Sequence, residues 1–90
     1  MNADQIAAVS AAAGSLVSAA MFLDHDREDS GVGNILWART RIADAGLSDI
    51  CSGEVVAMDA ALRSHDAGDD RAAATQATDA AVRLRLRLAA

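Results

Sequence analysis

The sequence predicts an all-α protein, a small antiparallel bundle of four helices. Ala is abundant and Pro is absent, a composition that favours helix along most of the chain. Apolar residues also recur at alternating spacings of three and four in four stretches, near residues 3–24, 34–45, 48–66 and 70–89. Ninety residues make one domain. The second and third connections are short, so we expect up-down-up-down order.

The first predicted helix has no charge at eighteen consecutive positions, from Ile6 to Leu23. Asn2 and Gln5 have the spacing of a capping box at its start. Its predicted inner seam is Ile6, Val9, Ala13, Leu16, Ala20 and Leu23. The opposite side is small and neutral rather than charged. A surface helix usually has one charged face, so this helix is expected to be covered on both sides.

The acidic stretch from Asp24 to Gly33 is predicted to be a loop, followed by a helix from about Asn34 to Ala45. Ile35, Ala38, Ile42 and Ala45 line one face of that helix. Gly46 is predicted to end it in the left-handed conformation, with Leu47 folding back towards Ile42.

Ser48 is the predicted N-cap of the third helix. The apolar seam of that helix is Cys51, Val55, Met58, Leu62 and His65. The fourth helix is expected to be capped by Asp69 or Asp70, with a seam of Ala74, Ala77, Ala81, Leu84 and Leu88. Its last residues, VRLRLRL, also alternate as a strand would. No second alternating segment exists to pair with them, so helix is the preferred interpretation.

Charge and cysteine content exclude several classes of function. The net charge is −5, so we expect no nucleic-acid partner. Cys51 is alone, which rules out an internal disulfide and favours a cytoplasmic location, with Cys51 as an inert buried thiol. The uncharged run is rich in Ala, Ser and Gly and is flanked by Asp residues. It is therefore expected to pack on protein rather than to span a membrane.

Antiparallel helices would bring the first and third connections to one end of the bundle. That end would collect seven carboxylates: Asp24, Asp26, Glu28, Asp29, Asp66, Asp69 and Asp70. It would also hold His25 and His65, each followed by Asp. A metal-binding module or metal-dependent helical enzyme built on these two pairs is the alternative interpretation. Adjacent residues do not share a helix face, so the spacing does not favour it.

No catalytic constellation, cofactor motif or metal-ligand spacing is recognisable, so we expect a protein that works by binding another protein. Because a self-paired dimer is the commonest way to cover such a face, a homodimer through the first helix is expected. Within this class we favour a small adaptor or inhibitor of the kind that phages and mobile elements encode. The predicted partner interface is Ala8, Ala11, Ala12, Ser15, Ser18, Ala19, Phe22 and Trp37.

Overall fold

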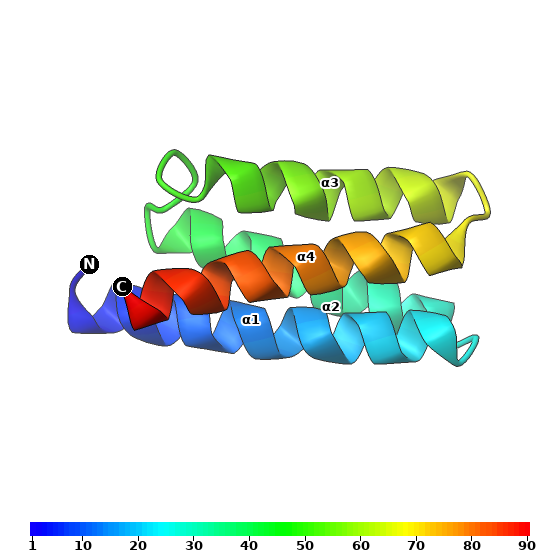
Figure 1. The fold of residues 1–90 in the computed structure, drawn as a ribbon, viewed down its shortest axis with the longest axis horizontal. Helices are drawn as coiled ribbons and strands as arrows, with labels where there is room; N and C mark the ends of the chain where they lie inside the picture. Colours follow the sequence, from blue (N-terminus) through cyan, green and yellow to red (C-terminus); the bar gives the residue numbers. More distant parts are fainter.

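A computed structural model describes all 90 residues and shows four helices in up-down-up-down order. They are α1 (Ala3–Asp24), α2 (Glu28–Asp44), α3 (Ser52–Asp66) and α4 (Asp70–Ala89). The α1–α2 and α3–α4 connections lie at one end of the bundle, and both chain termini and the α2–α3 connection lie at the other (Figure 1). The predicted fold class is confirmed.

The predicted start of α1 is confirmed in detail. The Gln5 main-chain N–H donates to the Asn2 side chain at 2.9 Å, and the Asn2 main-chain N–H donates to the Gln5 side chain at 3.0 Å. This reciprocal pair satisfies two N–H groups that the first turn of a helix leaves without partners. The Gln5 amide also donates to the Ala45 carbonyl at 3.2 Å, so the cap of α1 is joined to the end of α2.

Left-handed residues end the first three helices. Gly46 has φ +72°, its N–H donates to the Ala43 carbonyl, and the Leu47 N–H donates to the Ile42 carbonyl. These are the two hydrogen bonds of a Schellman motif, and they confirm the predicted cap. Gly68, with φ +81°, ends α3 in the same way. Asp26 takes the left-handed conformation after α1, with φ 57°, where a side chain is normally unfavourable.

The loop predicted for residues 24–33 is wrong, because α2 begins at Glu28, six residues earlier than expected. The glycines that suggested a loop lie inside the helix. A Cβ added to Gly31 would stand 2.7 Å from Leu23 Cγ and 3.3 Å from the Ala19 carbonyl oxygen. Gly31 therefore allows α2 to approach α1 closely. Glu28 and Asp29 also suit the first turn of a helix, where its dipole favours negative charge.

The predicted start of the third helix is also wrong. Ser48 does not cap it, because residues 48–51 form a separate turn closed by the Cys51 N–H and the Leu47 carbonyl at 2.8 Å. The helix begins at Ser52, one residue before Gly53, which weakens its first turn. In contrast, the C-terminal segment is helical as expected, and Asp69 caps α4 by accepting from the Ala72 N–H at 3.0 Å.

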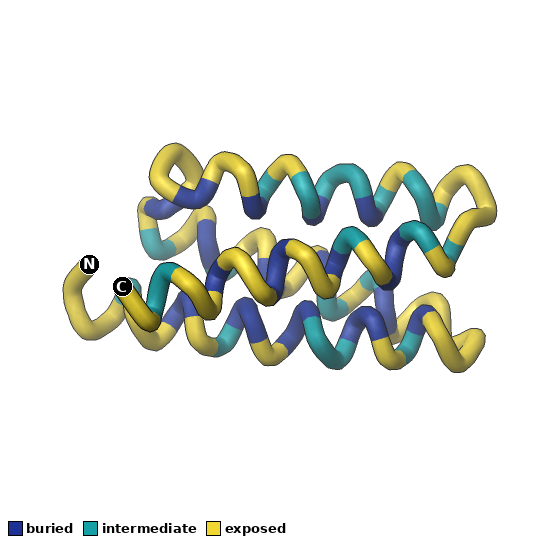
Figure 2. Tube along the Cα trace, viewed as in Figure 1, coloured by how far each residue is buried: buried dark blue, intermediate teal, exposed yellow.

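The core is built around α1, which packs against α2 on one side and α4 on the other, while α3 packs mainly on α4. Buried positions recur along α1 and α4 at helical spacing (Figure 2). Much of this core is Ala, whose small side chain lets helix backbones approach closely. The largest fully buried apolar side chains are Leu16, Leu23, Ile35, Ile42, Leu47, Met58 and Leu84.

Candidate functional site

Half of the predicted partner interface lies inside the bundle. Ala8, Ala12, Ser15 and Ala19 are buried within the single chain, so the prediction that they meet a partner is wrong. They form a second seam on α1, spaced four, three and four residues apart, that faces α2. Ser15 Oγ lies 2.9 Å from the Asn34 carbonyl oxygen and 2.8 Å from the Asn34 side-chain oxygen. The central position of α1 thus explains part of its missing charge.

A third stripe on α1 remains exposed and was not recognised from the sequence. It consists of Ala3, Ala7, Ser10, Gly14, Val17 and Met21, in which only Val17 is half-buried. The spacing alternates four and three, which is the pattern of a helix that packs against another helix. Ile6 was assigned to the inner seam, but it is 46% exposed and lies beside this stripe instead. The alternating spacing of four and three residues in the sequence was the signal that could have revealed this exposed stripe.

The other four predicted interface residues line a shallow open groove between α1 and α2, with a volume of about 700 Å³. Ala11, Ser18 and Phe22 belong to α1, and Trp37 belongs to α2. Gly14 and Gly33 lie in the floor, and a Cβ added to either would meet no atom within 4 Å. No charged side chain lines the groove. We call this groove and the exposed stripe of α1 the α1/α2 face.

Both aromatic residues of the chain border the groove, and each is covered by an arginine. The Arg27 guanidinium lies 5.8 Å from the centre of the Phe22 ring, and the Arg41 guanidinium lies 5.5 Å from the Trp37 ring. Trp37 is 48% exposed. Neither arginine takes part in any of the four ion pairs of the chain. Two cations free to meet carboxylates therefore flank an uncharged groove.

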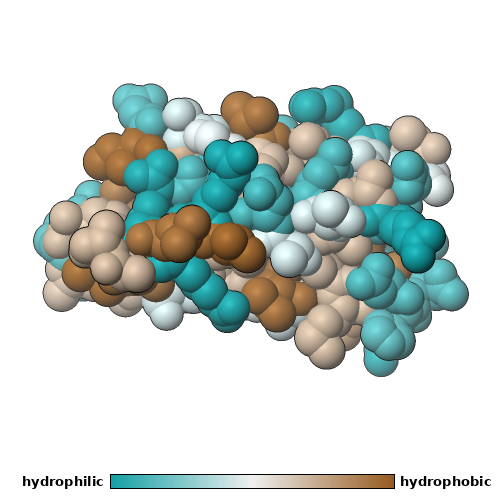
Figure 3. Space-filling view, viewed as in Figure 1, coloured by the Kyte–Doolittle hydropathy of each residue, from teal (hydrophilic) through white to brown (hydrophobic).

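The side of the molecule formed by α3 and α4 has a different character. Exposed apolar groups on that side are separated by hydrophilic ones (Figure 3). Val56, Val82 and Leu86 are at least half exposed, and the Arg83–Asp79 ion pair, 2.9 Å long, lies among them. Such an interrupted surface is ordinary for a folded protein in water. The uncharged α1/α2 face is the exception.

The α1–α2 and α3–α4 connections, which hold the predicted acidic residues, lie at the same end of the bundle (Figure 1). A polar cleft of about 680 Å³ lies between them, lined by Asp24, Asp26 and Asp70 together with Arg71. The remaining predicted acidic residues are Glu28, Asp29, Asp66 and Asp69. Glu28 is close enough to act on the His65 charge, which places α2 at the same end.

The two histidines at that end do not converge on one site. His65 Nδ1 lies 2.8 Å from Asp70 Oδ1, and this hydrogen bond raises the pKa of the imidazole. His25 Nδ1 instead donates to the Met21 carbonyl at 2.7 Å. No group of three His, Cys, Asp or Glu side chains lies close enough together to hold a metal ion. The metal-dependent alternative therefore gains no support from this geometry.

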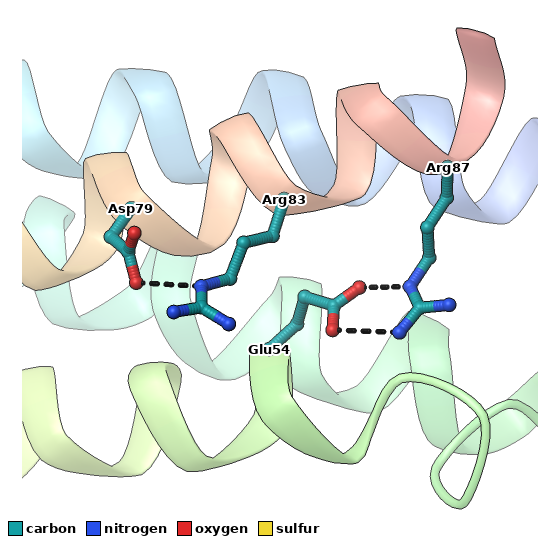
Figure 4. A network of polar contacts seen from close by, with 4 residues as sticks. All are labelled: Glu54, Asp79, Arg83 and Arg87. Atoms are coloured by element: carbon teal, nitrogen blue, oxygen red, sulfur yellow. Dashed lines mark hydrogen bonds and ion pairs between the residues drawn. The ribbon is translucent and has the colours of Figure 1, made fainter. Parts of the chain in front are cut away.

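The opposite end contains a buried ion pair that the sequence did not suggest. Glu54, on α3, is 2% exposed and accepts two hydrogen bonds from Arg87, on α4, one of them 3.1 Å long between Arg87 Nη2 and Glu54 Oε1 (Figure 4). Burial is the largest single influence and raises the pKa of the Glu54 carboxyl, but the Arg87 hydrogen bond, a backbone hydrogen bond and the charges of Arg87 and Arg83 together outweigh it and lower the pKa overall. Cys51 is buried nearby, and burial and the Glu54 charge raise the pKa of its thiol, as befits an inert cysteine.

By length and composition α1 could also cross a membrane, with a mean hydropathy of 1.9 over its most apolar window, half of which is buried in the bundle. A core helix of a water-soluble bundle has the same properties. No family model, curated protein or solved structure matches this chain. What the chain does must therefore be inferred from its surface.

Proposed function

We propose that this chain is a non-enzymatic module that binds another protein through the α1/α2 face. The observation that supports this proposal is the exposed part of α1, a helix of 22 residues with no charge between Asp4 and Asp24. The bundle itself covers two sides of α1. Its third side still has apolar and small residues where a solvated helix would have charges.

The glycines of the groove strengthen the proposal. Glycine in a helix interior is less favourable than Ala by roughly 0.5–1 kcal/mol. Gly31 has a reason inside the chain, since a Cβ there would clash with α1. Gly14 and Gly33 have none, because the space around them is open. Glycine at an exposed helix position is explained if another backbone or a large side chain approaches closely there.

The bordering residues also fit a protein partner. Trp, Tyr and Arg are the residues most enriched at the energetic centres of protein interfaces. Trp37 and Arg41 lie at one end of the groove, and Arg27, over the Phe22 ring, lies at the other. Binding alone is sufficient for an adaptor or inhibitor, which is the role we favour. A cytoplasmic setting and a phage or mobile-element origin are part of this proposal.

Site-specific photo-crosslinking in cells that express the chain tests the proposal. The crosslinking residue is placed at Met21, which is 61% exposed in the stripe of α1, and in a matched protein at Val56, which is 64% exposed on α3. We expect discrete protein adducts from position 21, which a Ser18→Glu change removes, and none from position 56. Lipid adducts from position 21, or the same adducts from both positions, would overturn the proposal.

A further inference from the structure

We infer that the partner of the α1/α2 face is a second copy of this chain, packed antiparallel, with Asp4 of each copy beside Arg27 of the other. This inference rests on the proposed function and identifies the partner. It follows from the charges at the two ends of the face, from the open glycines and from the size of the face.

The charges at the two ends of the face are self-complementary. Asp4 and Phe22 are eighteen residues apart, which is five helical turns, so they lie on one line along α1, on the side of α2. Arg27 lies over Phe22 at one end of this line. Asp4, at the other end, is exposed, and its carboxylate makes no ion pair. An unpaired anion and an unpaired cation are thus separated by the length of the face.

A two-fold axis across the middle of α1 pairs these charges twice. The midpoint between residues 4 and 22 lies next to Gly14, where the backbone of α1 is exposed. Rotation about an axis there, perpendicular to α1, places the copies antiparallel with α1 on α1 and α2 on α2. Asp4 of each copy then lies at the level of Phe22 and Arg27 of the other. A parallel arrangement would put like charges together at both ends.

The same operation gives Trp37 a place to pack. Ser15 is bonded to Asn34, so these two residues lie at the same level of the face, close to the axis. Trp37 is about one turn after Asn34, towards the C-terminal end of α2. The two-fold rotation therefore brings Trp37 opposite Gly33 and Asn34 of the other copy. The open space above Gly33 would receive the half-exposed indole.

The size of the face favours a folded copy over a single helix. The molecule is 37 Å long and 19–21 Å across, so one side offers about 800 Å². A stable interface buries roughly 800 Å² on each partner. A lone helix about 10–12 Å wide would cover only about half of that side. A second bundle, which presents α1 and α2 together, would cover all of it.

Charge exchange between the two positions tests the arrangement. Asp4→Arg and Arg27→Asp are made separately and studied by sedimentation equilibrium, alone and mixed. Each variant alone would place like charges together, and we expect its dimer to dissociate at least tenfold more readily than the wild type. The equimolar mixture restores two opposite-charge contacts, so it should dimerise like the wild type. Circular dichroism establishes that both variants are folded.

Asp66→Arg and Arg63→Asp make the same charge changes on α3, away from the face, and should leave association unchanged. If both single variants dimerise like the wild type, or if the mixture is as monomeric as its two components, the antiparallel arrangement is overturned. If the wild-type chain stays monomeric, the inference that the partner is a second copy is overturned. In that case, protein adducts from position 21 would still support the proposed function, and the absence of such adducts would overturn the proposed function as well.

Discussion

Replacing Arg87 by Met should destabilise the bundle far more than the same change at Arg83. Glu54 has 3% of its side chain exposed and Arg87 has 36%, so the variant leaves a buried carboxylate without its cation. Removing one partner of a buried pair costs about 3–5 kcal/mol. Because Arg87 is partly solvated, we expect about 2–3 kcal/mol, or a fall in Tm of roughly 10–20 °C for a domain of this size.

Arg83→Met is the matched control. Arg83 and its partner Asp79 have 55% and 52% of their side chains exposed, and solvated pairs of this kind contribute about 0–1 kcal/mol. Both substitutions keep an apolar stem and remove one positive charge from α4. The free energy of unfolding is measured by urea titration followed by circular dichroism. Equal losses in the two variants would refute the assigned role of the Glu54–Arg87 pair.

The pH dependence separates this mechanism from a simple loss of packing. In the wild type the pKa of Glu54 is lowered, so its contribution is present above the unfolded pKa of about 4.3 and is lost as pH falls through the folded pKa. In Arg87→Met the hydrogen bond and the charge of Arg87 are lost, so burial raises that pKa against only the backbone hydrogen bond and the Arg83 charge. The variant should therefore recover stability relative to the wild type between about pH 7 and 5. A difference in unfolding free energy between the wild type and Arg87→Met that stays constant over this range would contradict the mechanism.

Four further substitutions test individual features of the fold. Asp26→Gly should stabilise the chain by about 1 kcal/mol in urea unfolding, because glycine accepts the positive φ of 57°. Gly31→Ala should cost about 1–3 kcal/mol, because its Cβ would overlap α1, whereas Gly33→Ala in open space should stabilise the monomer by about 0.5–1 kcal/mol. The pKa of His65 is raised by Asp70, so this pair stabilises fully below about pH 6.5 and loses its effect as pH rises through the folded pKa. Asp70→Asn should accordingly cost more at low pH than at high pH, and a pH-independent cost would refute the assignment.

Local signals in the sequence were sufficient for most of the architecture. The Asn2–Gln5 cap, the Gly46–Leu47 helix end and the Asp69 cap depend on short spacings, and the structure contains all three. The helical fate of the C-terminal segment followed because no partner strand exists. Helix count and order then followed from four periodic stretches joined by short connections.

Features set by tertiary contacts could not be predicted in this way. A glycine-containing segment such as residues 30–33 suggests a loop, and only its contact with α1 shows why Gly31 is helical. The face of α1 was misassigned because a helix with no charge has no polar stripe to mark its outside. Ser15 therefore looked external although α2 covers it. The Glu54–Arg87 pair joins residues 33 positions apart, a distance over which sequence spacing carries no signal.

Sedimentation equilibrium of the wild type and of Gly14→Glu tests the central claim most directly. The substitution fills open space and replaces a weak helix former, so the folded monomer should be at least as stable as the wild type. The account predicts that the wild-type mass rises from 9.2 kDa towards twice that value at micromolar concentrations, whereas Gly14→Glu stays at 9.2 kDa. Equal masses for the two proteins at every concentration would contradict a functional contact through the α1/α2 face with a second copy.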